Sequence, residues 1–123
     1  MTGNGGPIDE PTYDALLKMT GDDQAFVDDL VDTYLEDAVE QLSALGAAID
    51  VGDPAALTRP AHSLKSSSMN VGALDLAKVS LELEERGRGG QLDGAAERVA
   101  DAHQQFEAVR DALLGRRGED AGG

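Results

Sequence analysis

Two long stretches of the chain carry apolar residues at alternating steps of three and four, and this period strongly constrains the fold. From about Asp23 to Ile49 the apolar positions are Val27, Val31, Tyr34, Ala38, Leu42, Leu45 and Ile49. From about Gly94 to Leu114 they are Val99, Ala102, Phe106, Val109 and Leu113. Residues three or four apart lie on one side of an α-helix. Each stretch therefore predicts an amphipathic helix whose apolar face needs a partner.

Shorter segments with a helical period lie at residues 11–19, 54–71 and 73–86, and glycine-containing turns separate them. In the segment 73–86, we expect one apolar stripe from Leu74, Ala77 and Leu81, with Leu76, Val79 and Leu83 beside it. Residues 87–90, Gly-Arg-Gly-Gly, are expected to form a loop. The chain shows no run of period two and no Asn-Gly hairpin, the signals of strands. These features predict an all-α fold, an antiparallel four-helix bundle with a short extra N-terminal helix.

Composition narrows the class of protein further. A chain of 123 residues with 3% aromatic residues predicts one domain with a core of Leu, Val and Ala. We expect the bundle at residues 10–115, between disordered tails at 1–9 and 116–123. The absence of cysteine excludes disulfides and thiolate chemistry. An excess of 24 acidic over 10 basic residues argues against nucleic acids and anionic membranes as partners.

The most informative single residue is His62, because the helical period places it away from the apolar stripe of its segment. That stripe consists of Leu57, Ala61, Leu64, Ser68 and Val71, and His62 points about 140° from it. Lys65 and Met69 share the face of His62, and Ser66 lies close by. An exposed imidazole with an ammonium group one turn away suits a carrier of phosphoryl groups better than a core residue.

The distribution of charge supports the same place. No acidic residue occurs between Asp53 and Asp75, although Arg59 and Lys65 both do. We expect this window to attract an anion, either a phosphoryl group or the acidic pocket of a partner.

Pro60 conflicts with a regular helix at this point. A proline inside a helix removes one backbone hydrogen bond. The helix is therefore either kinked near Pro60 or restarts near Arg59. We favour the kink, because Ala55, Ala56 and Leu57 continue the apolar pattern upstream.

The stretch from His62 to Ala73, His-Ser-Leu-Lys-Ser-Ser-Ser-Met-Asn-Val-Gly-Ala, resembles the signature of histidine phosphotransfer (HPt) domains. Leu83-Glu84 resembles the Leu-Glu pair on the following helix of that family, and the resemblance extends over about residues 10–115. It implies that His62 accepts a phosphoryl group from a receiver-domain aspartate and relays it to another receiver domain.

The resemblance also implies roles for neighbouring residues. Lys65 would offset phosphate charge, and Ser66, where many members have glycine, could reach a phosphoryl oxygen. We expect Arg59, Met69 and Glu84 to contact the partner.

The chain has no Gly-rich nucleotide loop and no Mg²⁺ site of its own. We therefore expect a phosphoryl carrier without cofactor or metal, whose chemistry relies on the partner receiver domain, rather than a kinase or other enzyme. The alternative is an adaptor that binds receiver domains without accepting phosphate. With no apolar run long enough for a membrane span and no signal-peptide pattern, a cytoplasmic monomer is expected.

Overall fold

The computed structural model describes residues 7–122, with side chains placed up to Arg116. Within this range the elements follow in the order α1 (Glu10–Met19), α2 (Gln24–Val51), a 3₁₀ turn η2 (Pro54–Leu57), α3 (Thr58–Asn70), α4 (Leu74–Arg88) and α5 (Ala95–Gly122). No strand occurs among these residues.

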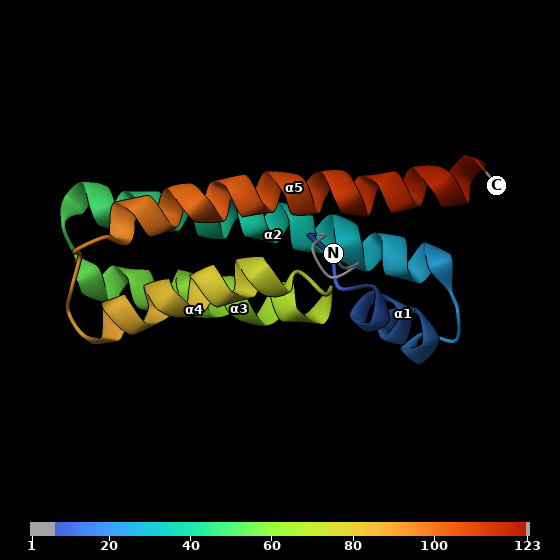
Figure 1. Cartoon of the computed structure of the whole chain (residues 1–123), viewed down its shortest axis with the longest axis horizontal. Helices are drawn as coiled ribbons and strands as arrows, with labels where there is room; N and C mark the ends of the chain where they lie inside the picture. The colour runs from blue at the N-terminus through green and yellow to red at the C-terminus, as the bar shows by residue number, and fades with distance from the viewer. Residues whose placement is uncertain (1–6, 123) are drawn as a thin grey trace, which may run out of the picture.

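The four longer helices form an antiparallel ring, in which α2 packs on α3, α3 on α4, α4 on α5, and α5 on α2 (Figure 1). The short helix α1 covers one end of the bundle, where it contacts α2 and α3. This arrangement confirms the predicted fold class. Within the described range, no helix combines the length and the apolar character that crossing a membrane requires.

The apolar stripes predicted for three of the helices form the core of the bundle. Every position in the stripes of α3 and α5 is buried, and in α2 only Ile49 remains partly exposed. The fully buried members of these stripes include Leu45, Leu57, Leu64 and Leu113. Burial of such side chains is the main favourable contribution to folding. The period of the sequence therefore identifies which face of each helix turns inward.

The stripe predicted for α4 is wrong in part. Leu74 and Leu81 are 43% and 39% exposed. The buried face consists instead of Leu76, Ala77, Ser80, Leu83, Glu84 and Gly87. Glu84 and Gly87 direct part of this face toward α3 and the turn before it. The helix is rotated from the expected orientation, so that Leu76 and Leu83, which were expected beside the stripe, lie in the buried face together with small and polar residues.

The start of α3 resolves the conflict at Pro60. The 3₁₀ turn η2 ends at Leu57 and α3 begins at Thr58, so the kinked continuous helix that we favoured is wrong. Pro60 is the third residue of α3, where a backbone N–H has no partner within the helix. The proline therefore costs this helix no hydrogen bond, and His62 lies shortly after it.

Gly87 brings α4 close to this junction. A Cβ atom built on Gly87 would lie 2.5 Å from Oγ1 and 2.9 Å from the backbone N of Thr58. Only glycine fits at such a separation. The loop predicted for residues 87–90 is therefore corrected at its start, because α4 continues through Gly87 to Arg88.

At the other end of the bundle, α5 continues well past Leu114, the predicted end of the helix. Arg116 forms ion pairs with Glu10 and Asp14, and its guanidinium lies 4.2 Å from the ring centroid of Tyr13. These contacts fix the extended part of α5 to α1.

The tail predicted for residues 1–9 lies mostly outside the described residues. Inside them, the backbone N–H of Asp9 donates to the carbonyl of Gly72 over 2.7 Å. Gly72 has a φ of +86°, and a Cβ there would lie 2.9 Å from the carbonyl oxygen of Asp9. This contact attaches the start of α1 to the end of α3. The division of the chain into a bundle with two disordered tails stays a prediction.

Candidate functional site

His62 stands on the outer face of α3, as the helical period predicts. Its side chain is 56% exposed, whereas Ala61 and Leu64 on the same helix are fully buried. The position combines a rigid backbone with a ring that solvent or a partner can reach.

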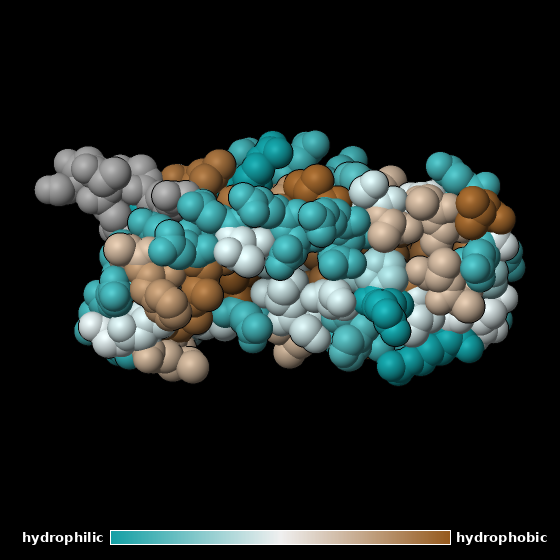
Figure 2. Space-filling model, turned by 180° about the vertical axis from the view of Figure 1, so that it is seen from behind, coloured by the Kyte–Doolittle hydropathy of each residue, from teal (hydrophilic) through white to brown (hydrophobic). Residues whose placement is uncertain are grey.

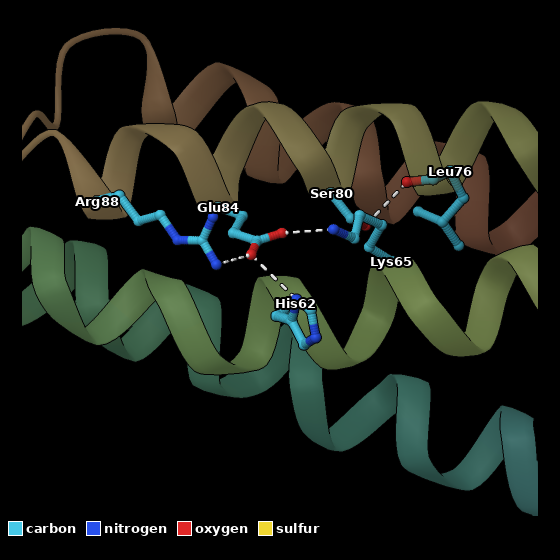
Figure 3. Close-up of polar contacts among 6 residues, drawn as sticks. All are labelled: His62, Lys65, Leu76, Ser80, Glu84 and Arg88. Carbon is cyan, nitrogen blue, oxygen red and sulfur yellow. Dashed lines mark hydrogen bonds and ion pairs between the residues drawn. The ribbon is translucent and has the colours of Figure 1, made fainter.

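One ring nitrogen of His62 is held by a buried carboxylate. Nδ1 lies 3.0 Å from Oε2 of Glu84, and the Glu84 side chain, which comes from α4, is only 1% exposed. The close-up shows the carboxylate between the two helices, pointing at the imidazole (Figure 3). The contact with a partner that we expected of Glu84 is not available to a side chain buried in this way.

Two further cations approach the same carboxylate. Nζ of Lys65 lies 3.0 Å from Oε1, and Nη2 of Arg88 lies 2.7 Å from Oε2 (Figure 3). Lys65 and Arg88 reach Glu84 from opposite sides, Lys65 from α3 and Arg88 from the last turn of α4. We call His62, Lys65, Glu84 and Arg88 the Glu84 cluster.

The cluster keeps Glu84 ionised. The Lys65 ammonium lowers the pKa of Glu84 most, and this effect together with the hydrogen bond to His62 and the charge of Arg88 outweighs the opposing effect of burial. The geometry of the Lys65 contact is that of an ion pair, because Oε1 has no aligned hydrogen bond among the described residues. A buried carboxylate without such partners would be strongly destabilising.

The ionised state of Glu84 determines the tautomer of His62. A carboxylate only accepts hydrogen bonds, so Nδ1 of His62 must donate to Oε2. In a neutral ring the proton is then on Nδ1, and Nε2 retains its lone pair. The arrangement therefore leaves Nε2 as a nucleophilic nitrogen on an exposed ring. The hydrogen bond from Nδ1 to Glu84 fixes the orientation of that ring.

A shallow cavity of about 440 Å³ adjoins the ring of His62. Its lining includes Arg59 and Arg88 together with the hydroxyl side chains of Thr58 and Ser63. The predicted site residue Arg59 thus lies beside His62. Two guanidinium groups and two hydroxyl groups therefore line this cavity, and groups of this kind bind anions.

The other predicted site residues lie farther along α3. Ser66 is exposed one turn after His62 and takes no part in the hydrogen bonds of Glu84. Met69 is 52% exposed and lines an apolar groove of about 600 Å³ between α1, α2 and α3. Apolar atoms gather near the α1 end of the face on which these helices lie (Figure 2).

Arg88 was not among the predicted site residues, because residues 87–90 were expected to form a loop, whereas Arg88 is the last residue of α4. The signal was present, because Glu84 and Arg88 are four residues apart and would meet on one face of a helix. The glycines on either side of Arg88 indicated a loop instead of a continuing helix. Within residues 7–116, no three His, Asp or Glu side chains are grouped in a way that could hold a metal ion.

Comparisons with known proteins point to one family. The family model of the Hpt domain matches residues 29–112. The fold is similar to the crystal structure of histidine-containing phosphotransfer protein B (HptB) from Pseudomonas aeruginosa PAO1, with a TM-score of 0.85 and 33% sequence identity. That match covers 94% of this chain and 97% of the other. No curated protein matches the sequence.

Proposed function

The chain belongs to the Hpt domain family of histidine phosphotransfer proteins, and we propose that His62 is its phosphoacceptor. In this proposal His62 takes a phosphoryl group from the aspartyl phosphate of one receiver domain and delivers it to the aspartate of another. The chain then acts as a carrier between two-component signalling proteins and not as a kinase.

The chemical step follows from the tautomer of His62. The lone pair of Nε2 attacks phosphorus, the P–N bond forms, and the P–O bond to the receiver aspartate breaks, which releases that carboxylate. No proton needs to leave the ring during the attack. The proton stays on Nδ1, which donates it in the hydrogen bond to Glu84. Positive charge develops on the ring as Nε2 bonds to phosphorus, and the Glu84 carboxylate 3.0 Å from Nδ1 stabilises it.

Lys65 has two functions in this proposal. It holds Glu84 through the contact with Oε1, and it brings a cation within one helical turn of the phosphorylated ring. Its side chain is 23% exposed, so its charge is partly shielded from water and acts more strongly than at an open surface. Ser66 is proposed as a hydrogen-bond donor to a phosphoryl oxygen from the exposed side of α3.

The partner class is a receiver domain, which would dock over His62 and along the apolar groove. Met69 extends this surface from α3, and Met19 and Leu30 line the groove from α1 and α2. Methionine adapts to different apolar partners, which suits a carrier that must bind a donor and then an acceptor. Arg59 would contact the acidic phosphorylation pocket of the receiver domain. Any metal ion needed for transfer would come from that pocket.

The observation that carries the proposal is an exposed imidazole whose Nδ1 is tied to a buried carboxylate. The test is transfer of label from a phosphorylated receiver domain to the purified chain. We expect the wild type to become labelled and His62→Gln to remain unlabelled. His103→Gln is the matched control, because His103 is the other histidine, exposed on α5. It should label like the wild type.

Two outcomes would contradict the proposal. Labelling of the His62→Gln variant would place the phosphoryl group elsewhere. Binding of the receiver domain without any labelling of the wild type would favour the alternative, an adaptor that only binds receiver domains.

A further inference from the structure

Arg88 shares a carboxylate oxygen with the proposed phosphoacceptor. Nη2 of Arg88 and Nδ1 of His62 both contact Oε2 of Glu84, at 2.7 and 3.0 Å. Arg88 also lines the cavity beside the His62 ring. Its guanidinium is therefore placed to act on the imidazole through Glu84.

The contact between Arg88 and Glu84 changes the net charge beside the imidazole of His62. A lone buried carboxylate beside an imidazole favours the protonated ring, because an opposite charge stabilises the charged form. A protonated ring has no lone pair on Nε2 and cannot attack phosphorus. Two cations on Glu84 offset its charge while it still accepts the Nδ1–H bond. The surplus positive charge also opposes addition of a proton to the ring.

Arg88 also contributes to stability, because the carboxylate that it pairs with is buried and needs cationic partners. The arginine side chain itself is 66% exposed and remains accessible beside the ring of His62. Arg86 lies in the same last turn of α4 and carries the same charge. Its Nε donates to the carbonyl of Asp93 instead, over 2.8 Å. A basic residue in the last turn of α4 is therefore not sufficient. Only the arginine at position 88 contacts Glu84.

We propose that Arg88 is a positioning residue of the phosphoacceptor, which holds Glu84 against Nδ1 of His62 and keeps the imidazole neutral with Nε2 free. This inference rests on the proposed function and adds a control of the nucleophile to it. The charged groups that face the ring are Glu84 and Arg88 from α4 and Arg59 and Lys65 from α3 itself. The turn η2 contributes only Ala55 to the cavity wall among the described residues.

The test compares Arg88→Met with Arg88→Lys and with the control Arg86→Met. The first readout is ¹⁵N NMR of the His62 ring in unphosphorylated protein at pH 7, which reports the tautomer and the protonated fraction. The second is the initial rate of phosphoryl transfer from a receiver domain between pH 6 and 9. Loss of one cation beside Glu84 is expected to increase the protonated fraction of the ring, because less of the negative charge of the carboxylate is then offset.

We expect Arg88→Met to show more protonated ring and to transfer about threefold to tenfold more slowly at pH 7. Its rate should return to that of the wild type near pH 9, where the ring is neutral in both proteins. Arg88→Lys keeps the charge and should restore the rate to within about twofold. Arg86→Met should match the wild type in both readouts.

Three results would overturn the inference. They are an unchanged ring spectrum in Arg88→Met, an equal loss of rate at every pH, and an equal loss in Arg86→Met. The second result would mean that Arg88 contacts the partner instead. If the wild type accepts no phosphate at all, the proposed function fails, but the ring spectrum still decides whether Arg88 controls the imidazole.

Discussion

The close approach at Gly87 allows a sharp prediction about stability. Replacement by alanine puts a Cβ atom 2.5 Å from Oγ1 of Thr58, 2.9 Å from its backbone N and 3.1 Å from the carbonyl oxygen of Pro54. Two of these three atoms belong to the backbone, so rotation of a side chain does not relieve the contact. The helix must move away from η2 and the start of α3.

Two opposing effects decide the magnitude. Alanine is favoured over glycine inside a helix by up to about 1 kcal/mol, and less near a helix end. Overpacking of this kind costs about 1–3 kcal/mol. We therefore expect Gly87→Ala to lower the free energy of unfolding by about 1–2 kcal/mol.

Gly46 provides the matched control. It lies inside α2, and a Cβ atom built there would meet no heavy atom within 4 Å. Gly46→Ala should raise the free energy of unfolding by about 0.5–1 kcal/mol. Urea unfolding followed by circular dichroism measures both variants. If Gly87→Ala proves as stable as Gly46→Ala, the contact between α4 and Thr58 is looser than described, and the reasoning is refuted.

Three further predictions concern charged and polar groups. Lys65→Ala should slow transfer or shorten the lifetime of phosphorylated His62, which kinetics of label transfer and loss will measure; unchanged values for both would remove Lys65 from the site. Because the pKa of Glu84 is lowered in the folded protein, its ionised form stabilises the fold above the ordinary value of 4.5, and this contribution is lost as the pH falls through the folded pKa. The stability difference between the wild type and Glu84→Gln should therefore shrink in acid, and a constant difference in urea unfolding at pH 7 and pH 3.5 would contradict this sign. Burial raises the pKa of Tyr34 to about 12, while its hydrogen bond with Ser68 opposes the shift; absorbance titration should show no Tyr34 phenolate at pH 10.5 while the protein remains folded.

The fold was largely predictable because apolar period is a local property. Residues such as Leu64 on α3 and Phe106 on α5 repeat at steps that a single helix imposes, so their burial could be inferred without knowing the partner helix. The exposure of His62 followed from the same geometry. These inferences need only the direction of each side chain around its own axis.

The errors arose where two helices act on each other. Glu84 is a charged residue, and its burial depends on Lys65 from α3 as well as on Arg88 from its own helix. The spacing of Glu84 and Arg88 is a local pattern, but no local pattern brings Lys65 to this carboxylate. Gly87 resembled the start of a loop, although its lack of a side chain serves the packing of α4 on the turn before α3. Pro60 was compatible with a kink or a new helix, and only the placement of the 3₁₀ turn distinguishes them.

The sequence therefore predicted the nucleophile, His62, but not the carboxylate of Glu84 that orients its ring. The sequence indicates His62 and Lys65 through their spacing on one face. The tautomer of the ring depends on Glu84, which lies 22 residues away from His62. Such a contact is specified by tertiary packing and becomes visible only in the folded chain.

The most direct test of the account is to determine which nitrogen bears phosphorus after transfer from a receiver domain. Long-range ¹H–¹⁵N NMR of the phosphorylated protein distinguishes the two ring nitrogens of each histidine. We predict phosphorus on Nε2 of His62, with Nδ1 still protonated against Glu84. Phosphorus on Nδ1 of His62, or on His103, would contradict the account.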